Sequence, residues 1–148
     1  MGASQAAYLV TGGETFLSGF TFKTLTYPMP ITELHVAFIE GKECFYYRRN
    51  DDLELVDNAV ATNLIGRLSK TGAYTHDLGR YWAYRALKER PELLKVVVHR
   101  YPHILIDEAQ DIGSVHQAIL QLLIDAGACV PLIGDPNPGI HDFAAADG

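Results

Sequence analysis

The spacing of hydrophobic residues changes along this chain and divides it into two parts. Up to about residue 51 the apolar positions form short runs rich in Thr, Phe and Tyr, which favour β-strands. The stretch TELHVAFIEGKECFYYRR predicts strands over 34–39 and 43–48, joined at EGK by a turn whose glycine allows a positive φ. The preceding ETFLSGFTFKTLTYPMP predicts one more strand, then a loop at its two prolines. We therefore expect a β-rich segment over 1–51.

From Asp52 onwards the apolar residues recur at helical spacing. A first helix is predicted over 53–68, a second begins near its candidate caps Thr75 and Asp77, and a third begins at Pro91. The supporting apolar stripes are Leu53, Val56, Val60, Leu64, Ile65 and Leu68 in the first helix, Leu78, Tyr81, Trp82 and Leu87 in the second, and Leu93, Leu94, Val97 and Val98 in the third.

The last third of the chain predicts a strand, a helix and a second strand. HILID and ACVPLIGD are near-continuous apolar runs, typical of strands buried inside a parallel sheet. Between them an amphipathic helix is predicted, opened by Ser114 and Gln117 at capping-box spacing and ended at Gly127. A unit of this length favours parallel strands and a right-handed crossover. The expected fold class is therefore α/β, with residues 52–148 forming a helical approach and a partial parallel sheet.

Composition is typical of one soluble globular domain. The chain has 148 residues, of which 48% are hydrophobic and 20% charged. No apolar run approaches the roughly 20 residues that span a bilayer, and the first ten residues lack the basic start of a signal peptide. Cys44 and Cys129 show neither metal-binding nor redox spacing and predict buried, reduced thiols. A cytoplasmic protein without a membrane role is expected.

The net charge of −6 argues against a stand-alone nucleic-acid binder, which usually carries a basic patch. The densest basic runs are YYRRN and ALKERPELLKVVVHRYP. Because their basic residues alternate with apolar ones, we interpret them as solvated faces of a strand and of helices.

Carboxylates stand at the ends of both predicted parallel strands. Asp107 and Glu108 follow the first, and Asp135 follows the second. Ligands of parallel α/β sheets bind beyond these strand ends, and neighbouring like charges need a cation between them. Mg²⁺ suits such a site because it takes few carboxylates together with water and phosphate oxygens. Alternatively, Asp107 and Glu108 are solvated loop residues and Asp111 caps the next helix; position alone leaves both interpretations open.

Two motifs resemble those of one known family. ILIDEAQD closely resembles motif II, the Walker B element, of UvrD/Rep-type superfamily 1 DNA helicases, and PLIGDPNPGIHDF resembles their motif III. The helical stretch before motif II, which opens with an HD pair and leads to RYPHILIDE, is also similar, so the resemblance covers about residues 71–146. It implies a partial RecA-like, P-loop NTPase-like parallel sheet, Mg²⁺ and ATP as cofactors, and single-stranded DNA as a partner of a complete motor.

The resemblance also implies roles for individual residues. Asp107 would hold Mg²⁺ through a water, and Glu108 would orient or deprotonate the water that attacks the phosphate. Gln110 would couple the nucleotide to domain movement, and Asp135 would support the same network. His141 and Phe143 fall where the family places aromatic residues that stack on single-stranded bases, although Phe143 also fits an ordinary core position.

The chain departs from the family pattern within motif III. Pro138 stands where the family has a glutamine that contacts the γ-phosphate, and Ala144 and Ala145 replace the usual Arg-Gly. His141 occupies the tyrosine position and can still stack, though less strongly. The loss of the phosphate-sensing group at Pro138 favours a second interpretation, in which the helicase scaffold is a non-enzymatic protein-interaction module that pairs with itself or with another protein.

The sequence contains no G-x-x-x-x-G-K-[ST], the loop whose amides and lysine hold nucleotide phosphates. VTGGETFLSGF offers glycines but no lysine at the required place, and the later helicase motifs are absent as well. We therefore expect a fragment of a UvrD/Rep-like ATP-dependent DNA helicase motor, truncated and inactive alone. A third interpretation is a single-stranded nucleic-acid binder that uses His141, Phe143 and the Arg48–Arg49 pair.

Overall fold

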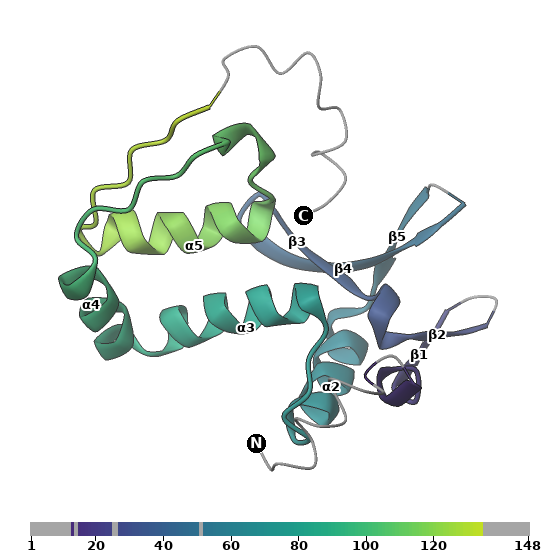
Figure 1. Cartoon of the computed structure of the whole chain (residues 1–148). Helices are drawn as coiled ribbons and strands as arrows, with labels where there is room; N and C mark the ends of the chain where they lie inside the picture. The colour runs from purple at the N-terminus through teal and green to yellow at the C-terminus, as the bar shows by residue number, and fades with distance from the viewer. Residues whose placement is uncertain (1–12, 14, 25–26, 51, 135–148) are drawn as a thin grey trace. The chain divides into compact units, whose positions relative to one another are not determined.

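A computed structural model describes residues 13, 15–24, 27–50 and 52–134 of the chain (Figure 1). The chain divides into two compact units. Unit 1 comprises residues 1–36 and 43–79, and unit 2 comprises residues 37–42 and 80–148. The elements in chain order are β1 (Thr21–Lys23), β2 (Pro28–Pro30), η1 (Ile31–Glu33), β3 (His35–Ile39), β4 (Lys42–Arg49), β5 (Asp52–Val56), α2 (Asn58–Ser69), α3 (His76–Glu89), α4 (Pro91–Arg100), η2 (Ala109–Asp111) and α5 (Ser114–Asp125).

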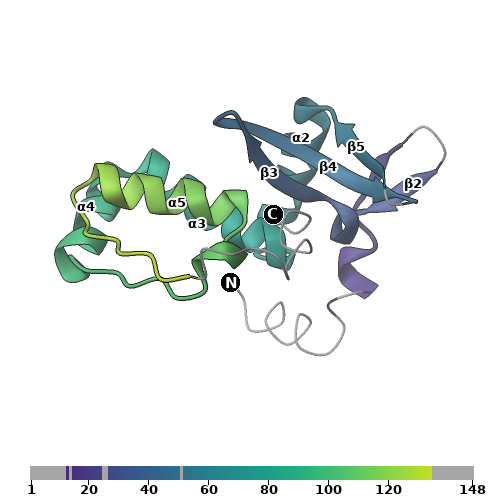
Figure 2. The same cartoon turned by 90° about the horizontal axis from the view of Figure 1, so that it is seen from above.

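The strands form two antiparallel sheets. β1 pairs with β2, so the prolines at 28 and 30, which were expected in a loop, lie in a short strand. The second sheet has the order β3-β4-β5, seen in Figure 2, and β4 runs antiparallel to β5 with Phe45 opposite Val56. The two strands predicted around EGK are confirmed within about one residue. Glu40 and Gly41 both have positive φ, 51° and 74°, as a tight hairpin turn requires.

The helix predicted from residue 53 begins only at Asn58. Leu53 and Val56 belong to β5 instead, and the placement of both on a helix was wrong. Alternation at Leu53 and Leu55 fits a strand as well as the stripe fits a helix, so the pattern there was ambiguous. Asp57 decides the boundary, because its carboxylate accepts hydrogen bonds from the amides of Ala59 and Val60 at 2.9 and 3.1 Å.

The buried core of unit 1 lies between α2 and the strands. α2 contacts β1 and buries Leu64, Ile65 and Leu68, as predicted, whereas Val60 is 44% exposed. Side chains from both sheets and from the connections between elements complete this core; the most buried are Phe22, Ile31, Leu34, Val36, Phe45 and Leu78.

The next two helices begin where the sequence places them. α3 begins at His76, and the hydroxyl of Thr75 accepts the Leu78 amide at 3.2 Å, which confirms Thr75 as a cap. α4 begins at Pro91. Its predicted apolar stripe is not buried: α4 has no buried residue, and Leu93 is 37% exposed. No described helix has the length and apolarity needed to cross a bilayer.

α5 packs against α4 and differs from its prediction at the N-terminus. The residue that precedes the helix is Gly113, and no side chain caps it, so the predicted capping box is wrong. The Ser114 hydroxyl instead accepts the backbone amide of Phe38 at 3.0 Å, and Gln117 donates to the Ile112 carbonyl. The end at Gly127 is confirmed by its φ of 99°.

The two predicted parallel strands are present only as paired extended segments. They are joined by parallel bridges at His103–Cys129 and Ile106–Leu132, and Figure 1 shows them side by side after α4 and α5. The fold is therefore mixed α/β, but both sheets of the described residues are antiparallel, and a parallel RecA-like sheet is not seen in them.

The two segments are also not buried as predicted. Leu105 is 64% and Leu132 60% exposed, and Cys129 is exposed too. A strand inside a parallel sheet is covered by neighbours on both edges and both faces. Within the described residues each segment pairs only with the other, which leaves their side chains accessible.

Candidate functional site

The acidic turn at residues 107–111 lies where the first extended segment ends. The Ile133 amide donates to the Ile106 carbonyl at 2.7 Å, and the Ala109 amide donates to the Ile133 carbonyl at 2.9 Å. These bonds fix the start of η2 to the end of the second segment. The acidic turn and Gly134 are thus held together, as expected for the ends of neighbouring parallel strands.

Glu108 occupies a strained conformation within this turn. Its φ of 52° and ψ of 46° are left-handed, which costs a residue other than glycine about 1–2 kcal/mol. The Glu108 amide donates to Asp107 Oδ1 at 3.0 Å, the Glu108 carbonyl accepts the Asp111 amide at 2.9 Å, and Gln110 Nε2 donates to the Glu108 carboxylate. Four residues of the turn are therefore tied to one another around Glu108.

Gly134 allows the second segment to approach the turn closely. A Cβ atom at position 134 would lie 2.5 Å from Gln110 Oε1 and 3.1 Å from the Ala109 amide nitrogen. Glycine is therefore the residue that fits here without displacing Gln110. Sequence reasoning did not single out Gly134, although its place directly before Asp135 was a signal that could have found it.

The turn is acidic and open to solvent. Asp107, Glu108 and Asp111 are exposed, and the chain has no Lys or Arg after Arg100. Asp111 lies in η2 and does not cap α5, so the interpretation of Asp111 as an N-cap was wrong. Among the described residues no three His, Cys, Asp or Glu side chains gather as a metal cage. One or two carboxylates with room for water and phosphate oxygens remain, and this donor set fits Mg²⁺.

The helix after the turn is anchored from the β3–β4 hairpin. Besides the bond from the Phe38 amide to Ser114, the Phe38 ring packs edge-on against Tyr84 of α3 at 4.6 Å between centroids. The hairpin tip, α3 and the start of α5 are thereby joined within unit 2, which fixes the start of the helix that follows the turn.

The remaining predicted site residues have no described geometry. Asp135, Pro138, His141 and Phe143 lie outside the described residues. The turn at 107–111 is therefore the part of the predicted site whose geometry is defined.

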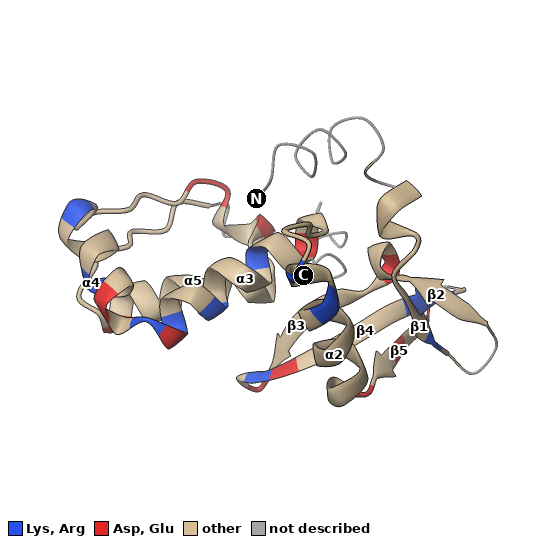
Figure 3. Cartoon of the chain, turned by 90° about the horizontal axis from the view of Figure 1, so that it is seen from below, with Lys and Arg blue, Asp and Glu red and all other residues tan. Residues whose placement is uncertain are grey.

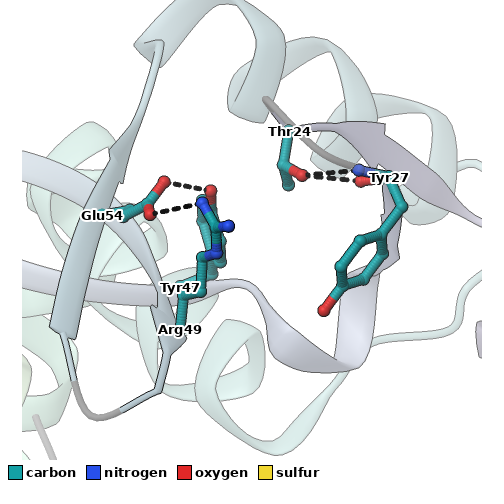
Figure 4. A network of polar contacts seen from close by, with 5 residues as sticks. All are labelled: Thr24, Tyr27, Tyr47, Arg49 and Glu54. Atoms are coloured by element: carbon teal, nitrogen blue, oxygen red, sulfur yellow. Dashed lines mark hydrogen bonds and ion pairs between the residues drawn. The ribbon is translucent and has the colours of Figure 1, made fainter.

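Unit 1 contains a separate polar network beside a cleft of about 420 Å³ (Figure 4). The Tyr47 hydroxyl donates to the Glu54 carboxylate, which also pairs with Arg49 at 3.4 Å. The hydrogen bond to Glu54 is the main cause that raises the pKa of Tyr47. Thr24 donates to the Tyr27 carbonyl at 2.6 Å and accepts its amide at 3.3 Å. Because these groups satisfy one another, we interpret the network as structural. The cleft is lined by Lys23, Thr24, Tyr47, Glu54, Leu55, Val56, Asp57 and Val60.

Comparisons with known proteins bear on the acidic turn. Residues 42–148 match the family model described as UvrD/REP helicase N-terminal domain. The chain is similar to the RecBCD enzyme subunit RecB of Borreliella burgdorferi, with 35% identity over 85 residues, which covers 54% of this chain and 7% of that protein. It is similar to the putative ATP-dependent DNA helicase YjcD of Bacillus subtilis, with 36% identity over 64 residues, 43% of this chain and 8% of that protein.

A third relative is an ATP-dependent helicase/nuclease polypeptide of Natranaerobius thermophilus, with 31% identity over 70 residues, 45% of this chain and 6% of that protein. The chain thus spans less than a tenth of the length of each of these relatives. No solved structure matches it significantly.

Proposed function

Because the chain belongs to the UvrD/REP helicase N-terminal domain family, we propose that it forms part of the ATP-driven motor of a UvrD/Rep-type DNA helicase. The observation that carries this proposal is the acidic turn, which follows one of two parallel-paired segments and touches the end of the other. Ligands of RecA-like sheets bind at such ends. The proposal includes a RecA-like arrangement of residues 52–148, preceded by a β-rich segment over 1–51.

The roles proposed for the turn follow from its chemistry. Asp107 holds Mg²⁺ through a water, Glu108 orients the attacking water and accepts its proton on a carboxylate oxygen, and Gln110 links this site to domain movement. Asp135 supports the same network, and His141 and Phe143 stack on single-stranded bases. Bound Mg²⁺ supplies positive charge that stabilises the phosphate oxygens during transfer.

The contact between Gln110 and Glu108 fits a site that has not yet bound nucleotide. The Gln110 amide occupies a Glu108 oxygen that the attacking water would otherwise use. Nucleotide binding would therefore release Glu108 from Gln110, and the strain at Glu108 lowers the free energy that this rearrangement requires.

We further propose that these 148 residues alone hydrolyse no ATP, because they contain no lysine-bearing phosphate loop. The test is phosphate release from MgATP by the purified chain, with Glu108→Gln as the control. Hydrolysis at the background rate in both proteins is expected. Magnesium-dependent hydrolysis that disappears in Glu108→Gln would refute the inactivity, while supporting the role of Glu108.

The exposed apolar residues of the paired segments favour a second candidate function, a protein-interaction module. Leu105, Leu132 and Ile133 are 64%, 60% and 51% exposed, and exposed apolar surface of this kind marks association sites. Light scattering across a concentration series tests self-association. A mass above that of one chain, lowered by Leu105→Lys, supports the module, and a single-chain mass at every concentration counts against pairing with itself.

A further inference from the structure

Positive charge in the second half of the chain is confined to one short segment. Residues 80–100 carry six of the chain's 12 Lys and Arg against two Glu, a net charge of +4. Residues 101–148 carry seven Asp and Glu and no Lys or Arg, a net charge of −7. The overall charge of −6 therefore hides a strongly basic segment. Its cations are Arg80, Arg85, Lys88, Arg90, Lys95 and Arg100.

The structure places these cations on α3, on α4 and on the residue between them, all within unit 2; they are blue in Figure 3. Two of them are engaged locally. Arg85 pairs with Glu89 and donates to the Tyr81 hydroxyl at 3.0 Å, and Lys88 Nζ lies 5.2 Å from the centroid of the Tyr84 ring. These contacts leave the charges of the other end of the segment to be explained.

Around α4 the cations lack anionic partners. No carboxylate of the described chain pairs with Arg90, Lys95 or Arg100. The Arg100 guanidinium lies 5.8 Å from the centroid of the Tyr101 ring, and Tyr101 is 55% exposed. An exposed aromatic ring beside unpaired cations combines the two features that bind single-stranded nucleic acid, base stacking and phosphate neutralisation.

We propose that the surface formed by Arg90, Lys95, Arg100 and Tyr101, termed the α4 surface, binds the backbone and bases of single-stranded DNA. DNA as the ligand rests on the proposed function, whereas the surface itself rests on charge and exposure. The net negative charge of the chain does not prevent this, because charges more than about 8 Å apart are largely screened at 0.15 M salt. The opposing interpretation is an ordinary solvated helix face.

The test is fluorescence anisotropy of a labelled oligothymidylate titrated with the full chain, without nucleotide, over a range of salt concentrations. Arg90→Gln/Lys95→Gln removes two cations of the α4 surface. Lys23→Gln/Lys70→Gln is the matched control, because it removes two exposed cations of unit 1. Circular dichroism verifies that each variant folds.

Each phosphate contact on a single strand contributes about 0.7 to the slope of log K against log salt. The α4 variant is therefore expected to reduce the magnitude of this slope by about 1.4, and the control variant to leave it unchanged. Tyr101→Ala should weaken binding at fixed salt by roughly 5-fold or more through lost stacking. Lys95→Arg should bind like the unchanged chain.

Three results would overturn the proposal: no binding by the unchanged chain, equal slopes for both double variants, or equally tight binding of polyglutamate, which would indicate an acidic protein partner. Asp107→Ala separates this proposal from the proposed function, because it should leave DNA binding in this assay intact. Loss of the slope change with an intact magnesium response at the turn would therefore count against the α4 surface alone.

Discussion

Gly134 lies so close to Gln110 that a Cβ atom at position 134 would come within 2.5 Å of the Gln110 side-chain oxygen. Through Gln110 this contact reaches Glu108, whose carboxylate accepts the Gln110 amide. The end of one extended segment thereby sets the position of the proposed catalytic carboxylate, which neither segment does by its own sequence.

Gly134→Ala is expected to displace Gln110 and to lower the free energy of unfolding by about 1 kcal/mol, because the added methyl group also presses on the Ala109 backbone. Urea unfolding measures the change. Gly66→Ala is the matched control: position 66 lies inside α2 with no atom within 4 Å of an added Cβ, so this variant should stabilise by about 0.5–1 kcal/mol. A loss of the same size in both variants would contradict the close approach at Gly134.

Asp57→Ala is expected to destabilise unit 1 by about 0.5–2 kcal/mol, because the carboxylate accepts the amides of Ala59 and Val60 at the start of α2. Asp57→Asn retains an acceptor oxygen and should cost much less. Thermal unfolding followed by circular dichroism distinguishes the two. Equal melting temperatures for Asp57→Ala and the unchanged chain would show that α2 does not depend on this cap.

Tyr47 predicts an alkaline loss of stability. Its hydrogen bond to Glu54 raises the pKa of Tyr47 above the ordinary value of 10.0. A raised pKa means that the folded state favours the protonated phenol, so this stabilisation is complete below pH 10 and is lost as the pH rises through the folded pKa. Unfolding free energies between pH 8 and about 11 should therefore fall more steeply for the unchanged chain than for Tyr47→Phe. Tyr27→Phe, at an exposed position, should follow the unchanged chain; a Tyr47→Phe profile parallel to both would contradict the coupling.

The sequence predicted α3, α4 and the β3–β4 hairpin well, because Thr75, Pro91 and Gly41 set their boundaries by local chemistry. It misplaced residues 53–56, where the same apolar pattern serves a strand and a helix and the Asp57 cap decides between them. Hydrophobicity indicated extended segments at HILID and PLIG but not their burial, since burial depends on neighbouring strands that the pattern does not specify.

For the site, the order of carboxylates predicted an acidic turn after the first segment, and the structure has one there. The left-handed conformation of Glu108 and its contact with Gln110 could not be predicted, because both follow from the close packing of Gly134 across the segment pair. The roles of the turn residues stay predictions until ligand binding is measured.

A magnesium titration of the ¹⁵N-labelled chain, followed by the amide signals of Asp107, Glu108 and Gln110, tests the proposed magnesium site without a need for catalysis. Millimolar Mg²⁺ is expected to shift these three signals selectively, and Asp107→Ala is expected to abolish the shifts while leaving the rest of the spectrum unchanged. Unchanged signals at the turn, or shifts that persist in Asp107→Ala, would contradict a magnesium site at Asp107.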